Sequence, residues 1–332
     1  MKKLTLAAAS VALALGLTAC NKQDTTQTQT AASEAPAAQV KAPLVSGVDS
    51  QYFDPAVKFS EDFFMAINGK WLAETEIPAD KASYGSFHVL ADNSQKAVKA
   101  IIDEVSARTD LKPGSDEQKL GSFYNSFMDE ATIEKLGLSP LSPQLDAIKA
   151  VTDKAQLPAL FARLQRDGVA IPFGWYVNND AKNSSQYAVY LSQGGLGLPD
   201  RDYYFKDDEA SQKILSAYQQ YLTDMFSLAG YADAEAAAQR VFALEKALAE
   251  HHWTRLESRN ADKTYNKMSA GDLNSSLGSF DWAAFAAGVK LDGVADIIVR
   301  QPSYFEGFAK VLETTDLQIW QDYLSLKTIH GY

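Results

Sequence analysis

The feature that most constrains this chain is its single cysteine, Cys20, which closes a short apolar run near the amino terminus. Everything after Cys20 lacks cysteine, so that part of the chain can form no internal disulfide. It must be held together by an apolar core alone, which a chain of this length can build. Hydrophobic residue types make up 46% of the 332 residues and aromatic types 11%, which is enough for such a core.

The amino terminus has the pattern of an export signal. Lys2 and Lys3 precede an apolar run over residues 4–17, which is shorter than the roughly 20 residues that span a bilayer. This pattern predicts a signal peptide over residues 1–19. The run ends in L-T-A-C at Cys20, which resembles a bacterial lipobox and implies that lipid on Cys20 anchors the protein to a membrane. An ordinary cleaved signal with an incidental cysteine is the alternative.

The segment after the signal predicts a tether and then a folded region. Residues 20–47 are rich in Thr, Gln, Ala, Ser and Pro, without apolar periodicity, which predicts a flexible linker. Asn21, rather than Asp, follows the cysteine, and by analogy with enteric sorting this favours the outer membrane, facing the periplasm or the cell surface. The formal net charge of −11 argues against a nucleic-acid partner, because phosphates call for a basic surface.

The folded region is predicted over residues 48–332 and is mainly α. Apolar residues recur at spacings of three and four, which indicates helices with one buried face. The predicted helices cover residues 94–107, 116–136, 157–166, 210–229, 233–252, 282–289, 303–312 and 317–329. Ser115 is a suitable N-cap for the second of these, and glycines 168 and 230 are suitable helix ends.

One stretch favours strands instead. Residues 169–177 and 187–191 are rich in β-branched and aromatic types, and the segment between them is rich in Asn. Two such runs around a polar turn predict a β-hairpin.

The sequence offers little that could carry chemistry. Its four histidines are His88, His251, His252 and His330, and none belongs to H-E-x-x-H, the spacing that holds zinc on one helix face. Adjacent helical side chains such as His251 and His252 point about 100° apart, so they are poorly placed to chelate one metal ion. The glycines at 194–197 lack the Lys-Ser/Thr of a phosphate loop, and the acidic pairs are typical of solvated helix faces. No catalytic or metal-binding residue is therefore predicted, and the substrate-binding residues stay unknown.

An ordered set of short motifs nevertheless resembles one family. Near the start it contains V-K-F-S-E-D-F-F at 57–64, N-G-K-W at 68–71 and Y-G-S-F at 84–87. Further on come G-L at 195–196, L-P at 198–199, D-Y-Y at 202–204, Glu245, Y-N-K-M at 265–268, Q-P-S-Y at 301–304 and W-Q-D-Y-L at 320–324. In order and spacing these resemble the amino-terminal portion of the neprilysin family of zinc metallopeptidases, which includes bacterial oligopeptidases.

The resemblance implies a fold and a function. The family is built as two lobes around an enclosed cavity, so this region is expected to form a multi-helical lobe of the neprilysin-like fold with a small β-hairpin. The complete enzyme would use zinc and cleave peptides. Its H-E-x-x-H and its third zinc ligand belong to the carboxy-terminal half, and the sequence ends at Tyr332 before them. We therefore expect a truncated chain that is inactive alone and associates with a complementary catalytic fragment. The alternatives are a non-catalytic peptide-binding or scaffold lipoprotein and the remnant of a disrupted gene.

Further expectations concern the amino-terminal motifs. Asn68-Gly69 is expected to form a turn, with Phe63, Phe64 and Trp71 buried near it. Ser83 stands where some family members have an Arg that approaches bound peptide, so this loop is not expected to contact a peptide carboxylate. Without the catalytic lobe, the first helices should expose apolar surface.

Overall fold

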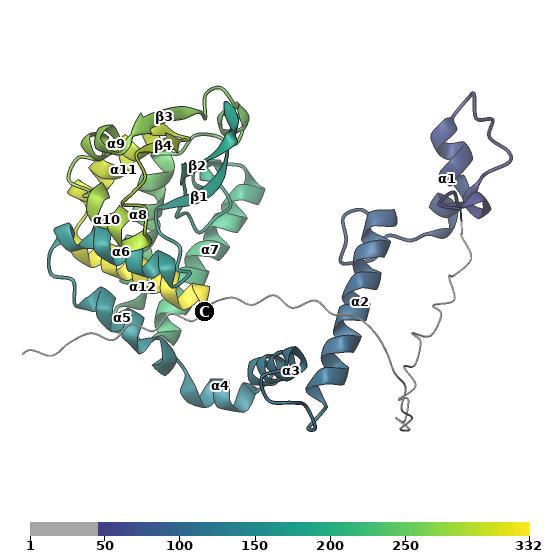
Figure 1. Cartoon of the computed structure of the whole chain (residues 1–332), viewed down its shortest axis with the longest axis horizontal. Coiled ribbons are helices and arrows are strands. Elements are labelled where there is room, and N and C mark those ends of the chain that lie inside the picture. The colour runs from purple at the N-terminus through teal and green to yellow at the C-terminus, as the bar shows by residue number, and fades with distance from the viewer. Residues whose placement is uncertain (1–45) are drawn as a thin grey trace, which may run out of the picture. The chain divides into compact units, whose positions relative to one another are not determined.

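The structure is a computed structural model that describes residues 46–332 (Figure 1). The predicted signal peptide, Cys20 and nearly all of the predicted linker lie outside the described residues. By its contacts the chain divides into two compact units, Met1–Val98 and Lys99–Tyr332. Across residues 46–332, no helix is both long enough and apolar enough to cross a membrane.

Helices dominate both units. The α-helices are α1 (Phe63–Glu74), α2 (Ser86–Ser106), α3 (Asp116–Phe127), α4 (Glu130–Leu136), α5 (Ser142–Lys149), α6 (Leu157–Arg166), α7 (Glu209–Leu228), α8 (Ala234–His251), α9 (Ala270–Ser276), α10 (Trp282–Val289), α11 (Pro302–Thr314) and α12 (Leu317–Gly331). The strands are β1 (Phe173–Asp180), β2 (Asn183–Gln193), β3 (Asn266–Ser269) and β4 (Asp296–Val299). Short 3-10 turns are η1 (Ser50–Tyr52), η2 (Ser139–Leu141), η3 (Lys154–Gln156), η4 (Arg201–Tyr204) and η5 (Glu257–Arg259).

The mainly α prediction is confirmed, and local capping explains several helix ends. The Ser115 hydroxyl accepts a hydrogen bond from the backbone N–H of Gln118 at 3.3 Å and so caps α3. Gly168 follows α6 with a φ of +85°, a conformation that glycine adopts without strain. The helix predicted over residues 116–136 is instead two helices. The Asp129 carboxylate caps the backbone N–H of Thr132 at 3.1 Å and starts α4 as a separate element.

The predicted turn at Asn68-Gly69 is wrong, because both residues lie within α1. Glycine suits this position for a packing reason. A Cβ on Gly69 would lie 2.8 Å from the Cβ of Asp54, so only glycine lets the preceding segment approach the helix. The predicted burial of Phe63 and Phe64 is also wrong, since both are more than 60% exposed. Trp71 is half-buried and stacks on Tyr84.

The predicted hairpin is confirmed as β1 and β2, but it belongs to a four-stranded sheet of order β1-β2-β4-β3. β2 runs parallel to β4, and β3 runs antiparallel to β4. The turn covers only residues 181–182, shorter than the predicted Asn-rich turn. Asp180 explains this, because its buried carboxylate accepts hydrogen bonds from the backbone N–H of Lys182 and from the Tyr265 hydroxyl, both at 2.9 Å.

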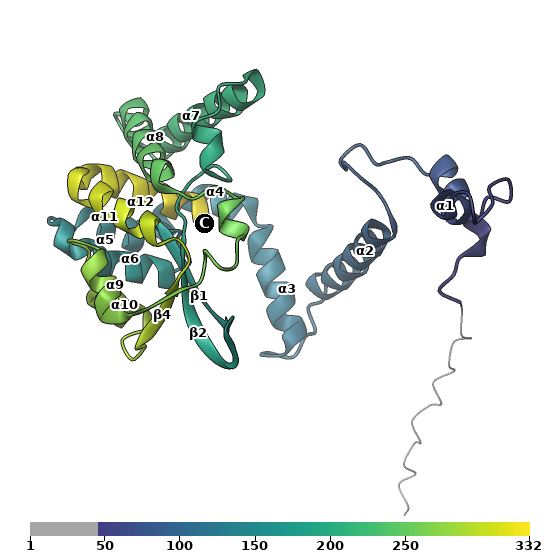
Figure 2. The ribbon, with the colours of Figure 1, turned by 90° about the horizontal axis from the view of Figure 1, so that it is seen from above.

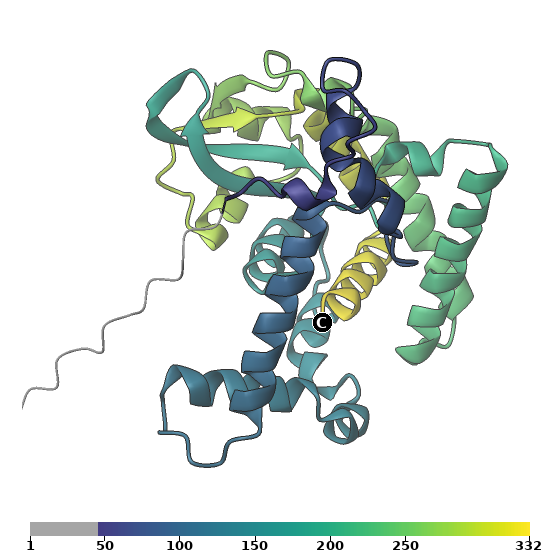
Figure 3. The same cartoon turned by 90° about the vertical axis from the view of Figure 1, so that its right-hand side faces the viewer.

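The core of the second unit is an aromatic cluster between the sheet and the helices. Phe173 of β1 lies at its centre, with ring centroids 5.0 Å from Phe285 of α10 and 5.6 Å from Phe308 of α11. Phe161 of α6 and Trp320 of α12 also belong to the cluster, and their ring centroids are 5.9 Å apart. Helices α7 and α8 lie side by side as a hairpin (Figure 2, Figure 3).

Candidate functional site

A cavity of about 350 Å³ opens in the second unit. Its wall comes from the loop after β2, from the residues after α8 and from the residues that join β4 to α11. Cavities of this size can take a small ligand or one or two residues of a peptide. Most of the family motifs found in the sequence meet at this wall or directly behind it, which makes it the candidate site.

The loop after β2 is fixed by contacts that only a glycine-rich sequence permits. Gly195 has a φ of +86°, and a Cβ there would lie 2.5 Å from the Tyr323 hydroxyl oxygen and 2.6 Å from the Cα of Pro172. The Tyr323 hydroxyl donates to the Gly195 carbonyl at 2.7 Å. Any larger residue at 195 would push the loop away from α12, so the glycine is needed for the shape of the cavity.

A buried ionic cluster lies behind this loop. Glu245 of α8 is fully buried and accepts hydrogen bonds from the hydroxyls of Tyr204 at 2.8 Å and Tyr218 at 2.7 Å. Lys327 of α12 donates to its other carboxylate oxygen at 2.8 Å. The Tyr204 hydroxyl in turn accepts from the backbone N–H groups of Gly197 and Leu198, both at 3.2 Å. Burial and the neighbouring carboxylate raise the pKa of both tyrosines well above the ordinary value, so both hydroxyls stay protonated as donors.

Gln193, the last residue of β2, ties two walls of the cavity together. Its side-chain oxygen accepts from the backbone N–H of Trp253 at 2.8 Å, and its side-chain nitrogen donates to the Trp253 carbonyl at 2.9 Å. Its backbone N–H donates to the side-chain oxygen of the buried Gln301 at 3.1 Å. The segment after α8 is thus held to the sheet by hydrogen bonds from side-chain amides. It does not pair with β2 as a neighbouring strand would.

His252, the residue directly after α8, serves this wall as a neutral donor. Its Nε2 lies 3.1 Å from the Gly194 carbonyl oxygen, so Nε2 carries the proton. The pKa of His252 is lowered to about 4, mainly by desolvation on burial and to a smaller extent by the positive charge of Arg201. The ring packs edge-on against Tyr304 at 4.6 Å. His252 therefore has a positioning role and does not act as a base near neutral pH.

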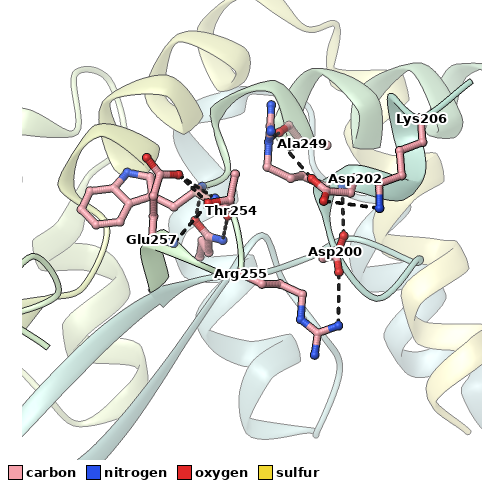
Figure 4. A network of polar contacts seen from close by, with 10 residues as sticks. Asp200, Asp202, Lys206, Ala249, Thr254, Arg255 and Glu257 are labelled. Carbon is pink, nitrogen blue, oxygen red and sulfur yellow. Dashed lines mark hydrogen bonds and ion pairs between the residues drawn. The ribbon is translucent and has the colours of Figure 1, made fainter. Parts of the chain in front are cut away.

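The charged groups of the cavity are two arginines and one carboxylate. Arg255 is 70% exposed and makes a loose ion pair with Asp200 at 3.6 Å (Figure 4). The other oxygen of Asp200 accepts from the backbone N–H of Asp202 at 2.9 Å. Arg300 is half-buried, and its guanidinium donates to the Ser258 carbonyl at 3.3 Å. With His252 neutral, the two arginines and Asp200 give the cavity a net charge of +1. The whole chain, by contrast, has a formal net charge of −11.

The other residues singled out in the sequence do not gather at this site. Cys20 lies outside the described residues. His88 packs near Tyr84 in the first unit, and His330 contacts Tyr221 at 2.6 Å. In the part of the chain that the structure describes, no group of three or more His, Cys, Asp or Glu side chains could hold a metal ion. Sequence reasoning missed Arg300 and Lys327, because nothing in their local pattern shows that long-range folding brings them to the cavity and the ionic cluster.

The comparisons with known proteins decide the family. The model of peptidase family M13 matches residues 59–332. The chain belongs to peptidase family M13. Human endothelin-converting enzyme 1 is 27% identical over 330 residues, which cover 95% of this chain and 42% of that enzyme.

Two solved structures share the fold of this chain. Zinc metalloprotease ZMP1 of Mycobacterium tuberculosis, in complex with an inhibitor, matches with a TM-score of 0.74 and 34% identity over 85% of this chain and 43% of that one. PepO of Lactobacillus rhamnosis matches with a TM-score of 0.63 at 19% identity, over 82% of this chain and 43% of PepO, which shows a common fold alone. The chain thus spans less than half the length of these relatives.

The residues at hand do not fit the zinc ion that the family implies. The 332 residues contain no H-E-x-x-H, and the described residues contain no alternative cluster of ligands. The cavity offers guanidinium groups, which repel a cation. It is suited to holding a negatively charged group.

Proposed function

We propose that this chain is the amino-terminal, substrate-enclosing portion of an extracytoplasmic zinc metalloendopeptidase that acts on peptides. The observation that carries the proposal is the family match over residues 59–332, together with the likeness to the zinc metalloprotease ZMP1. The chain corresponds to only 42–43% of the relatives' length, so the chemistry is assigned to a part of the enzyme that the 332 residues do not include.

We further propose that this chain does not hydrolyse peptides alone. Its sequence contains no H-E-x-x-H, and zinc in the complete enzyme would be held by the carboxy-terminal half. The chain's own contribution would be to enclose and orient the peptide, through a lobe whose inner loops are fixed by the Glu245 cluster.

The exposed apolar side chains of the second unit support association with a catalytic partner. Phe123 and Phe127 of α3 are 74% and 70% exposed, and Ile133 and Leu136 of α4 are exposed as well. Large apolar side chains that gather on short helices are typical of surfaces that another polypeptide covers. We propose that the complementary catalytic portion of the peptidase covers α3 and α4.

Export and anchoring belong to the same proposal. The sequence of residues 1–19 and the L-T-A-C motif support a signal peptide and lipid attachment at Cys20, with the protein held at the outer membrane. Labelled palmitate supplied to expressing cells should enter the wild-type chain and not a Cys20→Ala chain. Equal labelling of both would refute the anchor.

Association tests the central part of the proposal. The chain, purified in detergent, is mixed with a carboxy-terminal M13 polypeptide that carries H-E-x-x-H, and the mass of the product is measured by native mass spectrometry. We expect a one-to-one complex that Phe123→Asp together with Phe127→Asp weakens. Glu313→Gln, at an exposed position of α11 outside the proposed interface, is the control and should leave the complex intact. Two components that stay separate under all conditions would contradict the proposal.

A second candidate is a peptide-binding or scaffold lipoprotein without peptidase chemistry. The positively charged cavity favours it, because a site of this kind binds without a metal. It predicts peptide binding by this chain that a zinc chelator does not change, combined with no activity in any mixture.

A further inference from the structure

Arg300 holds a positive charge that no carboxylate among residues 46–332 matches. It is half-buried, yet its guanidinium has one hydrogen-bond acceptor among residues 46–332, the Ser258 carbonyl at 3.3 Å. No carboxylate in that part of the chain forms an ion pair with it, although acidic residues outnumber basic ones by 42 to 31. A guanidinium has five N–H donors in a planar fork that matches a carboxylate.

The backbone around Arg300 is held firmly, so its position is set before any ligand arrives. Its N–H donates to the Leu191 carbonyl of β2 at 2.9 Å. The next residue, Gln301, is buried and bonds to the N–H of Gln193. A fixed backbone reduces the entropy lost when the side chain engages a ligand.

Arg255 provides the second positive group of the same cavity. Its contact with Asp200 is 3.6 Å, which is longer than a hydrogen bond, and its side chain is 70% exposed. Figure 4 shows Glu257, the nearby acidic residue, bonded to Thr254, whose N–H and hydroxyl donate to its carboxylate at 3.0 and 2.8 Å. Both of these bonds fall on Oε2 of Glu257, which is not among the residues that line the cavity, so Asp200 is the one carboxylate in its lining.

The rest of the wall suits the flanking part of a peptide. Trp253, Leu196 and Leu198 are half-buried at the cavity and present apolar surface beside the two arginines. The volume of about 350 Å³ fits one or two residues. An inorganic anion would use the charges and leave this apolar surface unused, whereas a peptide would use both.

We propose that Arg300 and Arg255 form a carboxylate-binding site that takes an acidic group of a peptide, either a carboxy terminus or an Asp or Glu side chain. The inference rests on the proposed function for its choice of peptides. It assigns them an anchoring point at the cavity of the second unit.

Binding of small peptides to the full chain in detergent tests the site without any peptidase activity. The probes are acetyl-Ala-Phe with a free carboxy terminus, acetyl-Glu-Phe-amide and the neutral acetyl-Gln-Phe-amide, each titrated by calorimetry in low salt. We expect at least one acidic probe to bind about tenfold or more tightly than the neutral one, because its carboxylate can form charge-assisted hydrogen bonds with the guanidinium groups. Which acidic probe binds identifies the source of the carboxylate.

Variants locate the binding. Arg300→Gln should weaken the preferred probe about tenfold, and Arg300→Lys should restore part of the affinity because it keeps the charge without the fork. Arg166→Gln is the matched control. Its guanidinium also donates to one backbone carbonyl, that of Gly288 at 3.4 Å, but Arg166 is not among the residues that line the cavity. Near-UV circular dichroism confirms that each variant is folded.

Several results would overturn the site. They are equal binding of the neutral and acidic probes, no binding of any probe at millimolar concentration, or unchanged affinity in Arg300→Gln. Binding of inorganic phosphate without any binding of peptide would show an inorganic anion site and would also overturn the proposal. None of these results depends on zinc or on a catalytic partner. The carboxylate site can therefore be refuted while the proposed peptidase function stands, and the peptidase function can be refuted while the site stands.

Discussion

The Glu245–Lys327 pair should be the most sensitive point of the second unit. Both side chains are buried, with Glu245 fully so, and Nζ of Lys327 lies 2.8 Å from Oε1 of Glu245. Lys327→Met keeps much of the side-chain volume and removes the positive charge. Glu245 is then left as a buried carboxylate with two tyrosine hydroxyls and no counter-charge. Removing one partner of a buried ion pair costs about 3–5 kcal/mol, which is a large share of the stability of an ordinary domain.

Urea unfolding of the full chain, followed by tryptophan fluorescence, measures this cost. Four of the five tryptophans lie in the second unit, so the signal reports mainly on that unit. The matched control is Lys119→Met, which removes an exposed lysine that lies 3.2 Å from Asp116. An exposed pair contributes little, so the control should change the free energy of unfolding by less than about 0.5 kcal/mol.

A double variant separates the charge from the packing. Glu245→Gln combined with Lys327→Met removes both charges and keeps an acceptor for a tyrosine hydroxyl. It should be more stable than the sum of the two single changes predicts, by about 1–3 kcal/mol. The reasoning would be refuted if Lys327→Met cost no more than Lys119→Met, or if the two single changes simply added.

Three further perturbations have defined outcomes. Gly195→Ala should destabilise the chain by more than Gly168→Ala, because both glycines have a positive φ but only the Cβ at 195 meets other atoms, and urea midpoints compare them. Ser115→Ala should cost about 1 kcal/mol through loss of the α3 cap, again by urea midpoint, and a cost near zero would show that the cap is not needed. The pKa of His252 is about 4 in the folded chain and about 6.5 when unfolded, so its neutral form contributes stability that is present above pH 6.5 and lost as the pH falls towards 4. Melting temperatures at pH 7 and pH 4.5 should differ more for the wild type than for His252→Gln, and an equal difference would contradict this role.

Local patterns in the sequence were enough to predict much of the fold. The predicted helices over residues 157–166 and 282–289 match α6 and α10, because α6 has a strong apolar face that ends before Gly168, and the apolar α10 begins at the side-chain cap of Asp281. The hairpin followed from β-branched and aromatic runs. Strands β3 and β4 were missed, since each has four residues and depends on pairing across long stretches of chain.

The candidate site was less predictable for the same physical reason. The motifs around Gly195, Tyr204, Glu245 and Tyr323 were found as an ordered set, and the structure shows that they contact one another. Their contacts join residues up to 128 positions apart, as in the bond from Tyr323 to Gly195. At Asn68-Gly69 the local pattern was misleading, because it predicts a turn where the chain is helical. The glycine is needed there for the close approach of Asp54 to the helix.

The measurement that tests the central claim most directly is peptide hydrolysis together with zinc content. The full chain is assayed alone, and then with a carboxy-terminal M13 polypeptide that carries H-E-x-x-H, against a quenched fluorescent peptide. The same partner with Gln in place of the motif Glu is the control. The account predicts no activity and no stoichiometric zinc for the chain alone, and zinc-dependent hydrolysis that appears only in the mixture with the intact motif. Hydrolysis by the chain alone, or no gain in activity on mixing despite bound zinc, would contradict it.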